Sequence, residues 1–320
     1  MSKQVRNSIL LLLTAFIWGV AFVAQSEGGD AVGPYTFNCI RSIIGGCVLI
    51  PVIFIIKKIT TRGNENKSIN IENKPKENKK ILIIGGILCG SALFMGSTLQ
   101  QLGLYYGTTA GKAGFLTACY ILLVPILGLF LKKKCGFNIW IGVFLSLIGL
   151  YLLCIDESFS LAFGDILVLC SAMAFSMHIL LVDYFSPKVN GVKMSCIQFF
   201  TCGLIGVVPT VFVEMGTSTA DISSWIAALG SLSAWIPILY AGVLSCGVAY
   251  TLQIIGQDGL NPTIASLLMS LESVFAVLAG WILLGQNMSI KEVSGCVLIF
   301  AAIILAQLPI DKVMPLKHKK

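Results

Sequence analysis

Ten apolar stretches, each close to the length of about 20 residues that a helix needs to cross the hydrocarbon core of a bilayer, take up most of this chain of 320 residues. They predict ten membrane-spanning helices and leave no room for a water-soluble catalytic or nucleic-acid-binding domain. The predicted helices cover approximately residues 8–25, 34–56, 81–106, 111–131, 137–155, 163–184, 193–214, 235–256, 262–284 and 290–310.

The composition of the chain agrees with a membrane location. Hydrophobic residues make up 56% of the chain and charged residues 12%, whereas soluble domains carry about 25% charged residues. The mean hydropathy is +0.89. We therefore expect an all-α, polytopic membrane protein whose surface mostly faces lipid.

Charged residues are distributed unevenly between the two ends of the predicted helices. If the N-terminus is cytoplasmic and the ten helices alternate in direction, cytoplasmic segments hold nineteen of the 22 Lys and Arg residues. The first four loops on the opposite side hold six acidic residues and no basic one. This positive-inside pattern predicts a multi-pass protein of the plasma membrane with both termini in the cytoplasm.

The chain repeats itself at about half its length. The phrase TLQQLG at Thr98–Gly103 returns as TLQIIG at Thr251–Gly256, an offset of 153 residues. In the same way CIR at Cys39–Arg41 returns as CIQ at Cys196–Gln198, an offset of 157 residues. Five helices per half is an odd number, so the second half must begin on the opposite side of the membrane. We therefore expect two inverted five-helix repeats.

These repeats divide the chain into a first unit over residues 1–157, a second unit over residues 158–311 and a basic tail over residues 312–320. Within the first unit, residues 62–80 read RGNENKSINIENKPKENKK. This segment is rich in Asn, Lys and Glu and has almost no apolar side chains, so we expect a disordered cytoplasmic linker there.

Several chemistries find no support in the residues. The stretch YYGTTAGKAG at Tyr105–Gly114 has Tyr106 where a phosphate-binding loop requires Gly, and Ala113 follows Lys112 where Ser or Thr is required. The eleven cysteines lie almost entirely within apolar runs, which predicts small buried side chains. With only two histidines, the chain has few residues that could form a metal cluster or a nucleophile–histidine pair. We expect no enzyme, no cofactor and no metal site.

Two charged residues lie well inside predicted helices. Glu272 is ten residues into the ninth helix, near the bilayer midplane, and Arg41 is seven residues into the second, roughly 10 Å deep. A charge at bilayer depth costs free energy unless a cavity or a partner compensates it. Glu272 is therefore either a substrate- or proton-binding residue or a structural hydrogen-bonding residue. For Arg41 the sequence favours a side chain that reaches outward to lipid headgroups.

Other polar and aromatic residues in the apolar runs are candidates to line a cavity, with packing or interhelical hydrogen bonds as the alternative. Lys112, at the start of the fourth helix, is expected to be an interfacial lysine. The candidate substrate-binding residues are Glu272, Gln100, Gln253, Trp18, Tyr120, Tyr250 and His178.

LLMSLESVFAVLAGWILLGQ, around Glu272, resembles the ninth-helix signature SLEPVFAxLxGxLxLGE of EamA-type members of the drug/metabolite transporter superfamily. AFIWGVAFVAQ, Arg41 and TTAGKAGFLTACYILLVPILGLFL are similar to the first-half counterparts of that signature. Two positions depart from the family pattern. Ser273 stands in place of Pro, which removes an expected kink after Glu272, and Gln286 stands in place of the final Glu.

The resemblance implies a secondary transporter that moves a small metabolite, for example an amino acid or a related compound and often for export, by alternating access. Helices 3, 4, 8 and 9 would border a central cavity, and the two repeats would rock about it. The competing hypothesis is a non-transporting membrane scaffold or receptor. The expected partners are a small-molecule substrate and the lipid bilayer, with a homodimer left open and no nucleic acid.

Overall fold

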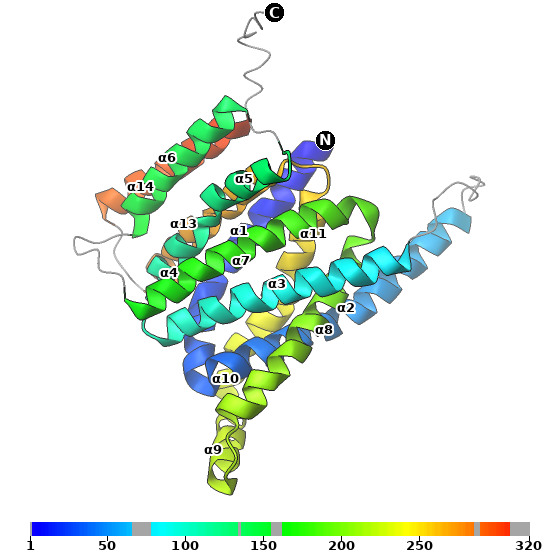
Figure 1. The fold of residues 1–320 in the computed structure, drawn as a ribbon, viewed down its shortest axis with the longest axis vertical. Coiled ribbons are helices and arrows are strands. Elements are labelled where there is room, and N and C mark those ends of the chain that lie inside the picture. The colour runs from blue at the N-terminus through cyan, green and yellow to red at the C-terminus, as the bar shows by residue number, and fades with distance from the viewer. Residues whose placement is uncertain (1, 66–77, 134–135, 155–161, 285–288, 308–320) are drawn as a thin grey trace, which may run out of the picture.

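The computed structural model describes residues 2–65, 78–133, 136–154, 162–284 and 289–307 (Figure 1). Most of the predicted linker over residues 62–80 and the tail over residues 312–320 lie outside this part of the chain. The described residues form helices throughout and no strand. The first repeat contains α1 (Lys3–Val32), α2 (Pro34–Glu65), α3 (Lys79–Tyr105), α4 (Ala110–Ala118), α5 (Tyr120–Phe130) and α6 (Phe137–Cys154).

The second repeat follows the same plan with more interruptions. Its helices are α7 (Phe163–Phe185), η2 (Ser186–Lys188), α8 (Gly191–Pro209), η3 (Thr210–Glu214), α9 (Thr219–Leu229), α10 (Leu232–Leu239), η4 (Tyr240–Ala249), α11 (Tyr250–Gln257), α12 (Pro262–Met269), α13 (Leu271–Leu284) and α14 (Ile290–Gln307). Eight helical segments in the described part of the chain are long and apolar enough to cross a membrane, and two shorter apolar helices lie over Phe137–Leu152 and Val293–Ala306. Each of the ten predicted helices therefore has a counterpart.

Four spans are not single α-helices. The seventh continues from α8 into the π-helix η3. The fourth is divided into α4 and α5 at Cys119, the ninth into α12 and α13 at Ser270, and the eighth contains the ten-residue π-helix η4 between α10 and α11. The breaks at Cys119 and Ser270 occupy matching places in the two repeats, which is the arrangement that many transporters use near their substrate sites. The short helix α9 was not expected from the sequence.

The turns that precede these divided spans are built alike. Gly107 (φ +91°) and Gly259 (φ +76°) both adopt the left-handed backbone conformation that glycine tolerates. Two residues later, Thr109 caps α4 and Asn261 caps α12 by accepting a hydrogen bond from the backbone of the first turn. Both pairs are 152 residues apart. The offset of 153 that relates the third and fifth spans to the eighth and tenth is therefore 152 between the fourth and the ninth.

Reciprocal contacts show that the repeats are inverted. The Cys39 thiol donates to the carbonyl oxygen of Gly203 at 3.4 Å, and the Cys196 thiol donates to that of Gly46 at 3.5 Å. These four residues are two equivalent pairs at the offset of 157, so α2 and α8 cross with their directions opposed. Equivalent helices that pack antiparallel across a membrane can arise only from an inverted repeat.

The pair α6 and α14 crosses in the same way. A Cβ atom placed on Gly142 would lie 3.0 Å from the carbonyl oxygen of Ala302, and one placed on Gly149 would lie 2.9 Å from that of Gly295. Each contact is the counterpart of the other, because Gly142 corresponds to Gly295 and Gly149 to Ala302 at the offset of 153. Figure 1 shows the two helices side by side at one edge of the molecule.

Between these two crossings, helices of one repeat pack against helices of the other repeat. In Figure 1 α3 runs beside α7, and glycines along α3 allow close contact: Gly85 faces Phe185, Gly96 faces Phe175 and Gly103 faces the backbone of Gly164. The equivalent packing joins α1 to α10, η4 and α11, where Gly256 faces the backbone of Asn7. Small residues at such positions are typical of helix contacts in membranes.

The described cysteines are all free thiols. Five of them are buried, whereas Cys47 and Cys170 are exposed on the apolar outer surface. The prediction of buried side chains is therefore wrong for these two positions.

Candidate functional site

A central cavity lies between two sets of packed helices, α3 with α7 and α1 with α10, η4 and α11. Its lining comes from α1, α2, α3, α4, α5, α7, η4, α11, α12 and α13. The residues that line it are Trp18, Phe22, Gln25, Arg41, Gln100, Thr117, Tyr120, Phe175, His178, Ile179, Ser245, Tyr250, Gln253, Met269 and Glu272. All seven candidate residues named from the sequence belong to this set, although they come from six helices that are distant along the chain.

The cavity is narrow in this conformation. It leaves about 40 Å³ for the centres of water molecules, which is enough for about three waters when each needs roughly 10–15 Å³. A metabolite larger than this would fit only after the surrounding helices separate.

Glu272 lies at the start of α13 and only 4% of its surface is exposed. The Tyr120 hydroxyl, at the start of α5, donates a hydrogen bond to Glu272 Oε1 at 3.1 Å. Among the ion pairs formed by described residues, none involves Glu272. The acid is thus held by one phenol beside the cavity, which leaves it able to bind a proton or a cationic group.

Arg41 is buried, and the expectation that its side chain reaches the lipid headgroups is wrong. Its Nε donates to Asn38 Oδ1 at 3.0 Å, its Nη1 donates to Gln25 Oε1 at 2.8 Å, and its guanidinium lies 5.3 Å from the centre of the Phe37 ring. These neutral partners hold the guanidinium at the cavity wall. In the described part of the chain no carboxylate forms an ion pair with it, so its positive charge is available to an anionic group.

Gln100 and Gln253 are equivalent residues with different partners. Gln100 Nε2 donates to Thr117 Oγ1 at 2.9 Å. At the offset of 152, the counterpart of Thr117 is Met269, which offers no hydrogen-bonding hydroxyl. Separately, Gln253 Oε1 is buried without a hydrogen-bond partner among the described residues. A buried acceptor left unpaired costs free energy. Such a group is a candidate hydrogen-bond partner for a bound solute.

Aromatic side chains form one wall of the cavity. The rings of Trp18 and Tyr250 have their centres 4.5 Å apart, and the His178 ring meets Tyr250 edge-on at 5.9 Å. His178 Nε2 pairs with Gln198 Oε1 at 3.1 Å, so His178 Nε2 is the donor in this arrangement. Trp18 Nε1 is a buried donor with no partner, and it adds an unpaired N–H to this wall.

Lys112 is more than an interfacial lysine. Its Nζ lies 2.6 Å from Asp165 Oδ2. Asp165, at the start of α7, is 1% exposed and also accepts from Thr108 Oγ1 at 2.9 Å and from the backbone N–H of Ala162 at 2.8 Å. Sequence reasoning missed Asp165 because it lies in the first turn of its helix, where an acidic residue needs no special explanation.

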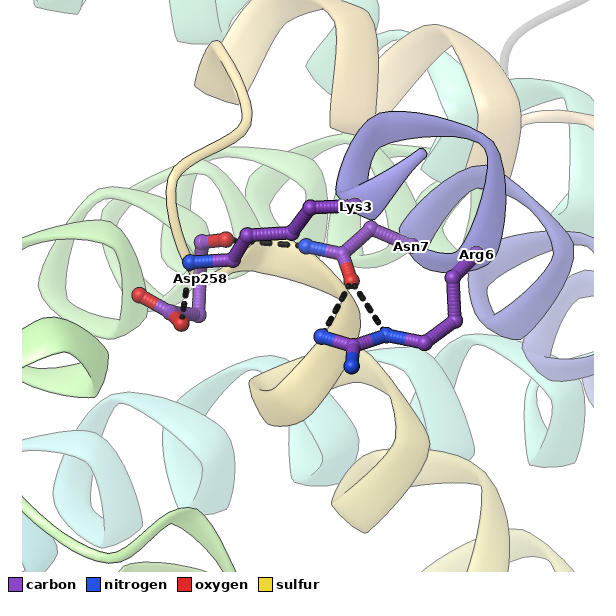
Figure 2. Close-up of polar contacts among 4 residues, drawn as sticks. All are labelled: Lys3, Arg6, Asn7 and Asp258. Atoms are coloured by element: carbon purple, nitrogen blue, oxygen red, sulfur yellow. Dashed lines mark hydrogen bonds and ion pairs between the residues drawn. The ribbon is translucent and has the colours of Figure 1, made fainter. Parts of the chain in front are cut away.

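A second ion pair lies at the other end of the molecule. Lys3 Nζ is 2.8 Å from Asp258 Oδ2, and Asn7 Nδ2 donates to the backbone carbonyl of Asp258 at 2.8 Å (Figure 2). Arg6 in turn donates to Asn7 Oδ1 through two nitrogens, both at 3.3 Å. The start of α1 is thereby tied to the turn between α11 and α12, at the place equivalent to the contact of α7 with the turn before α4.

Within the described residues no group of three or more His, Cys, Asp or Glu side chains is arranged to hold a metal ion. The polar groups at the cavity are instead one carboxyl, one guanidinium, three amides, two phenols, two aliphatic hydroxyls, an imidazole and an indole N–H. Such groups can bind a small solute by hydrogen bonds and charge, and they fix its orientation in the cavity.

Comparisons with known proteins identify the family and the fold of this chain. The EamA-like transporter family matches the chain over residues 6–155 and again over residues 162–308. An uncharacterized transporter of Archaeoglobus fulgidus is 27% identical over 96% of this chain and 87% of its own length. The uncharacterized transporter YoaV of Bacillus subtilis is 22% identical over 94% of this chain and 97% of its own length.

A solved crystal structure has the same fold, with a TM-score of 0.73 at 16% identity over 96% of this chain and 98% of the other. The family match covers both halves of the chain, in agreement with the two repeats. This chain therefore belongs to the EamA-like transporter family.

Proposed function

We propose that this membrane transporter is a secondary transporter, which moves a small metabolite through the central cavity by alternating access. The observation that carries the proposal is the cavity itself: a carboxyl (Glu272) and a guanidinium (Arg41) are both buried beside it with no ionic partner among the described residues. Because buried charges are costly in a membrane protein, they usually mark a substrate or ion pathway.

The small size of the cavity supports a conformational cycle. Room for about three waters is too little for most metabolites, so the substrate must enter a wider state. The cavity is lined by both divided spans, α4–α5 and α12–α13, and divided helices form the substrate sites of many transporters, around which rigid units rock.

The two charges also favour a class of substrate. A guanidinium binds a carboxylate through paired hydrogen bonds, and a carboxylate binds an ammonium group. We propose a small zwitterion, such as an amino acid or a related compound, with its carboxylate toward Arg41 and its amine toward Glu272.

For orientation we propose the plasma membrane, with both termini in the cytoplasm, on the basis of the positive-inside distribution of Lys and Arg. Lys58, near the exposed end of α2, would then be cytoplasmic, whereas Asp30 and Ser218 would be external. Single cysteines at these three exposed positions test the orientation with a membrane-impermeant thiol reagent on intact cells. Labelling of the Lys58→Cys variant from outside contradicts it.

The transport proposal is tested by counterflow in reconstituted vesicles. Vesicles loaded with an unlabelled mixture of amino acids should accumulate a radiolabelled member of that mixture, and the initial rate should saturate with concentration. Repeating the assay with a pH gradient distinguishes coupling to protons from simple exchange. A non-transporting scaffold or receptor, the competing hypothesis, gives the same trace as empty vesicles for every solute.

A further inference from the structure

The ion pairs among the described residues join helices of different sequence repeats, so they group the helices differently from the repeats. Three ion pairs occur among the described residues: Lys3–Asp258 at 2.8 Å, Lys112–Asp165 at 2.6 Å and Lys133–Asp183 at 2.7 Å. In each of them the lysine comes from the first repeat and the aspartate from the second. None of them crosses the central cavity.

Two of these pairs join the fourth span to α7. Lys112 is in the first turn of α4, and Lys133 lies just beyond the end of α5, while Asp165 and Asp183 lie near the two ends of α7. The fourth span is therefore fastened to α7 at both ends. Because α3 also packs along α7 through its glycines, α3, α4, α5 and α7 form one unit, which we call bundle A.

The third pair fastens the equivalent unit. Lys3 and Asn7, at the start of α1, hold the turn between α11 and α12 through Asp258 (Figure 2). Further along α1, a Cβ on Gly19 would lie 2.7 Å from the carbonyl oxygen of Glu272, so α1 and α13 touch through their backbones. We call the set of α1, α10, η4, α11, α12 and α13 bundle B.

No ion pair among the described residues joins bundle A to bundle B. Beside the cavity the Tyr120 hydroxyl of bundle A donates to Glu272 Oε1 of bundle B. At the end where α4 begins, Gln101 Nε2 donates to the carbonyl oxygen of Gln25 at 2.7 Å, and Ser273 Oγ donates to that of Gly114 at 3.0 Å. These are single neutral hydrogen bonds. They can be broken and remade at a lower cost than a half-buried ion pair with additional hydrogen bonds.

We propose that bundles A and B, rather than the two sequence repeats, are the rigid units that move against each other during transport. Lys112, Asp165, Lys133 and Asp183 act as positioning residues that keep the fourth span attached to α7. In bundle B the hydrogen bond from Asn7 to Asp258 and the backbone contact of Gly19 with Glu272 keep α1 attached to α12 and α13. The reciprocal crossings α2–α8 and α6–α14 join the bundles at the two flanks. This inference rests on the proposed alternating access but not on the identity of the substrate.

Two cross-links distinguish bundle motion from repeat motion, because the two hypotheses make opposite predictions for them. A cross-link between K112C and D165C joins different repeats within bundle A. A cross-link between G29C and Q101C joins α1 to α3, which are in the same repeat but in different bundles. In that double variant the Gln101 side chain, which a Cβ on Gly29 would meet, is itself replaced. Both cross-links lie at the same end of the molecule.

The readout is access to the cavity and requires no known substrate. In a background without the eleven native cysteines, the cavity-lining residue Ser245 is replaced in an S245C variant. The variants are first cross-linked with a bifunctional thiol reagent that is too large to enter the central cavity, so that the thiol at position 245 stays free for the readout. A small membrane-impermeant methanethiosulfonate is then added to right-side-out or inside-out vesicles, and the rate of labelling at position 245 is measured from each side.

We expect S245C without a cross-link to be labelled from both sides. The K112C/D165C cross-link should leave both rates nearly unchanged. The G29C/Q101C cross-link should lower the rate from one side by at least about tenfold, which corresponds to a 1.4 kcal/mol shift of the equilibrium between the two states. If the K112C/D165C variant does not fold, a K133C/D183C cross-link makes the same test at the opposite end of bundle A.

Three results overturn the inference. In the first, the K112C/D165C cross-link blocks access from one side while the G29C/Q101C cross-link does not, so the repeats are the moving units. In the second, both cross-links have the same effect. In the third, position 245 is labelled from one side only, or from neither, before any cross-link is made; alternating access itself then fails, independently of which helices move together.

Discussion

Tyr120 and Glu272 are equivalent residues of the two repeats, and they touch: the Tyr120 hydroxyl donates to Glu272 Oε1 at 3.1 Å. A residue can contact its own counterpart only where the pseudo-two-fold axis that relates the repeats passes between them. This contact therefore marks the axis, and the axis runs through the cavity that both residues line. The repeats differ there in chemistry, because one supplies a phenol and the other a carboxyl.

Replacing Glu272 with Gln should reduce transport while leaving the fold intact. Gln keeps the size of the side chain and can still accept the hydrogen bond from Tyr120, but it cannot ionise. If the carboxyl binds a proton or an ammonium group, counterflow should fall by at least about tenfold, the effect of losing 1.4 kcal/mol of interaction. Thermal unfolding in detergent should change little.

The matched control is Tyr120→Phe, which removes the hydrogen bond and keeps the carboxyl. We expect it to retain more transport than Glu272→Gln. If Glu272→Gln transports like the parent protein across a series of pH values, Glu272 is a structural hydrogen-bonding residue and not a substrate or proton site.

The two equivalent glutamines should respond to the same substitution in opposite directions. Gln100→Leu removes the hydrogen bond to Thr117 and should lower the free energy of unfolding by about 0.6–2 kcal/mol. Gln253→Leu removes a buried acceptor that has no partner and should raise the free energy of unfolding by about 1 kcal/mol. Denaturation of the two purified variants in the same detergent measures both effects.

Transport completes this comparison. We expect Gln253→Leu to lose transport despite its greater stability, because Gln253 Oε1 is available to the substrate. A Gln253→Leu variant that is less stable than the parent protein would mean that the amide is paired within the folded chain, and Gln253 would lose its place in the site.

Much of this fold and site follows from the sequence for a simple physical reason. Ten apolar runs of bilayer length leave little choice but ten helices, and a polar residue inside such a run must face a cavity or a partner. On that ground alone Glu272, Gln100 and Gln253 are expected to face a cavity or a partner, and all three line the central cavity. The repeated phrases also predicted the inversion, since an odd number of helices per half reverses the second half.

Other features depend on contacts that only the folded chain brings together. Arg41 was expected near the lipid headgroups because its amide partner, Gln25, lies on another helix with no sequence pattern that links the two. The pairing of Lys112 with Asp165 is likewise a meeting of different repeats. The breaks at Cys119 and Ser270 contain neither Gly nor Pro, so the residue types at these positions do not predict a helix break.

Two lysine-to-methionine variants should separate the strong ion pair from the weak one. Asp165 is 1% exposed and Lys112 23% exposed, whereas Lys3 and Asp258 are 59% and 37% exposed. Lys112→Met should cost about 2–3 kcal/mol of stability, somewhat less than the 3–5 kcal/mol for a fully buried pair. Lys3→Met should cost about 0–1 kcal/mol. Thermal unfolding in detergent at low and high salt measures both.

A double variant shows whether the cost comes from the orphaned acid. Adding Asp165→Asn to Lys112→Met removes the unpaired charge and should restore part of the lost stability. Equal costs for Lys112→Met and Lys3→Met would show that burial does not strengthen the first pair, and Lys112 would then be an ordinary interfacial lysine after all.

The contact between α1 and α13 gives a test of how closely the cavity depends on packing. A Cβ on Gly19 would lie 2.5 Å from the Cβ of Phe275 and 2.7 Å from the carbonyl oxygen of Glu272. Neither atom is the end of a flexible side chain, so Gly19→Ala must push α13 away and shift Glu272 with it. Overpacking of this kind costs typically about 1–3 kcal/mol, and we expect both stability and counterflow to fall.

Gly111→Ala is the matched control, since a Cβ at Gly111 in α4 would meet nothing within 4 Å. There Ala should stabilise the helix by roughly 0.5–1 kcal/mol, because the unfolded chain has less backbone entropy with Ala than with Gly. If Gly19→Ala keeps the stability and transport of the parent protein, α1 and α13 do not form the tight contact on which the position of Glu272 depends.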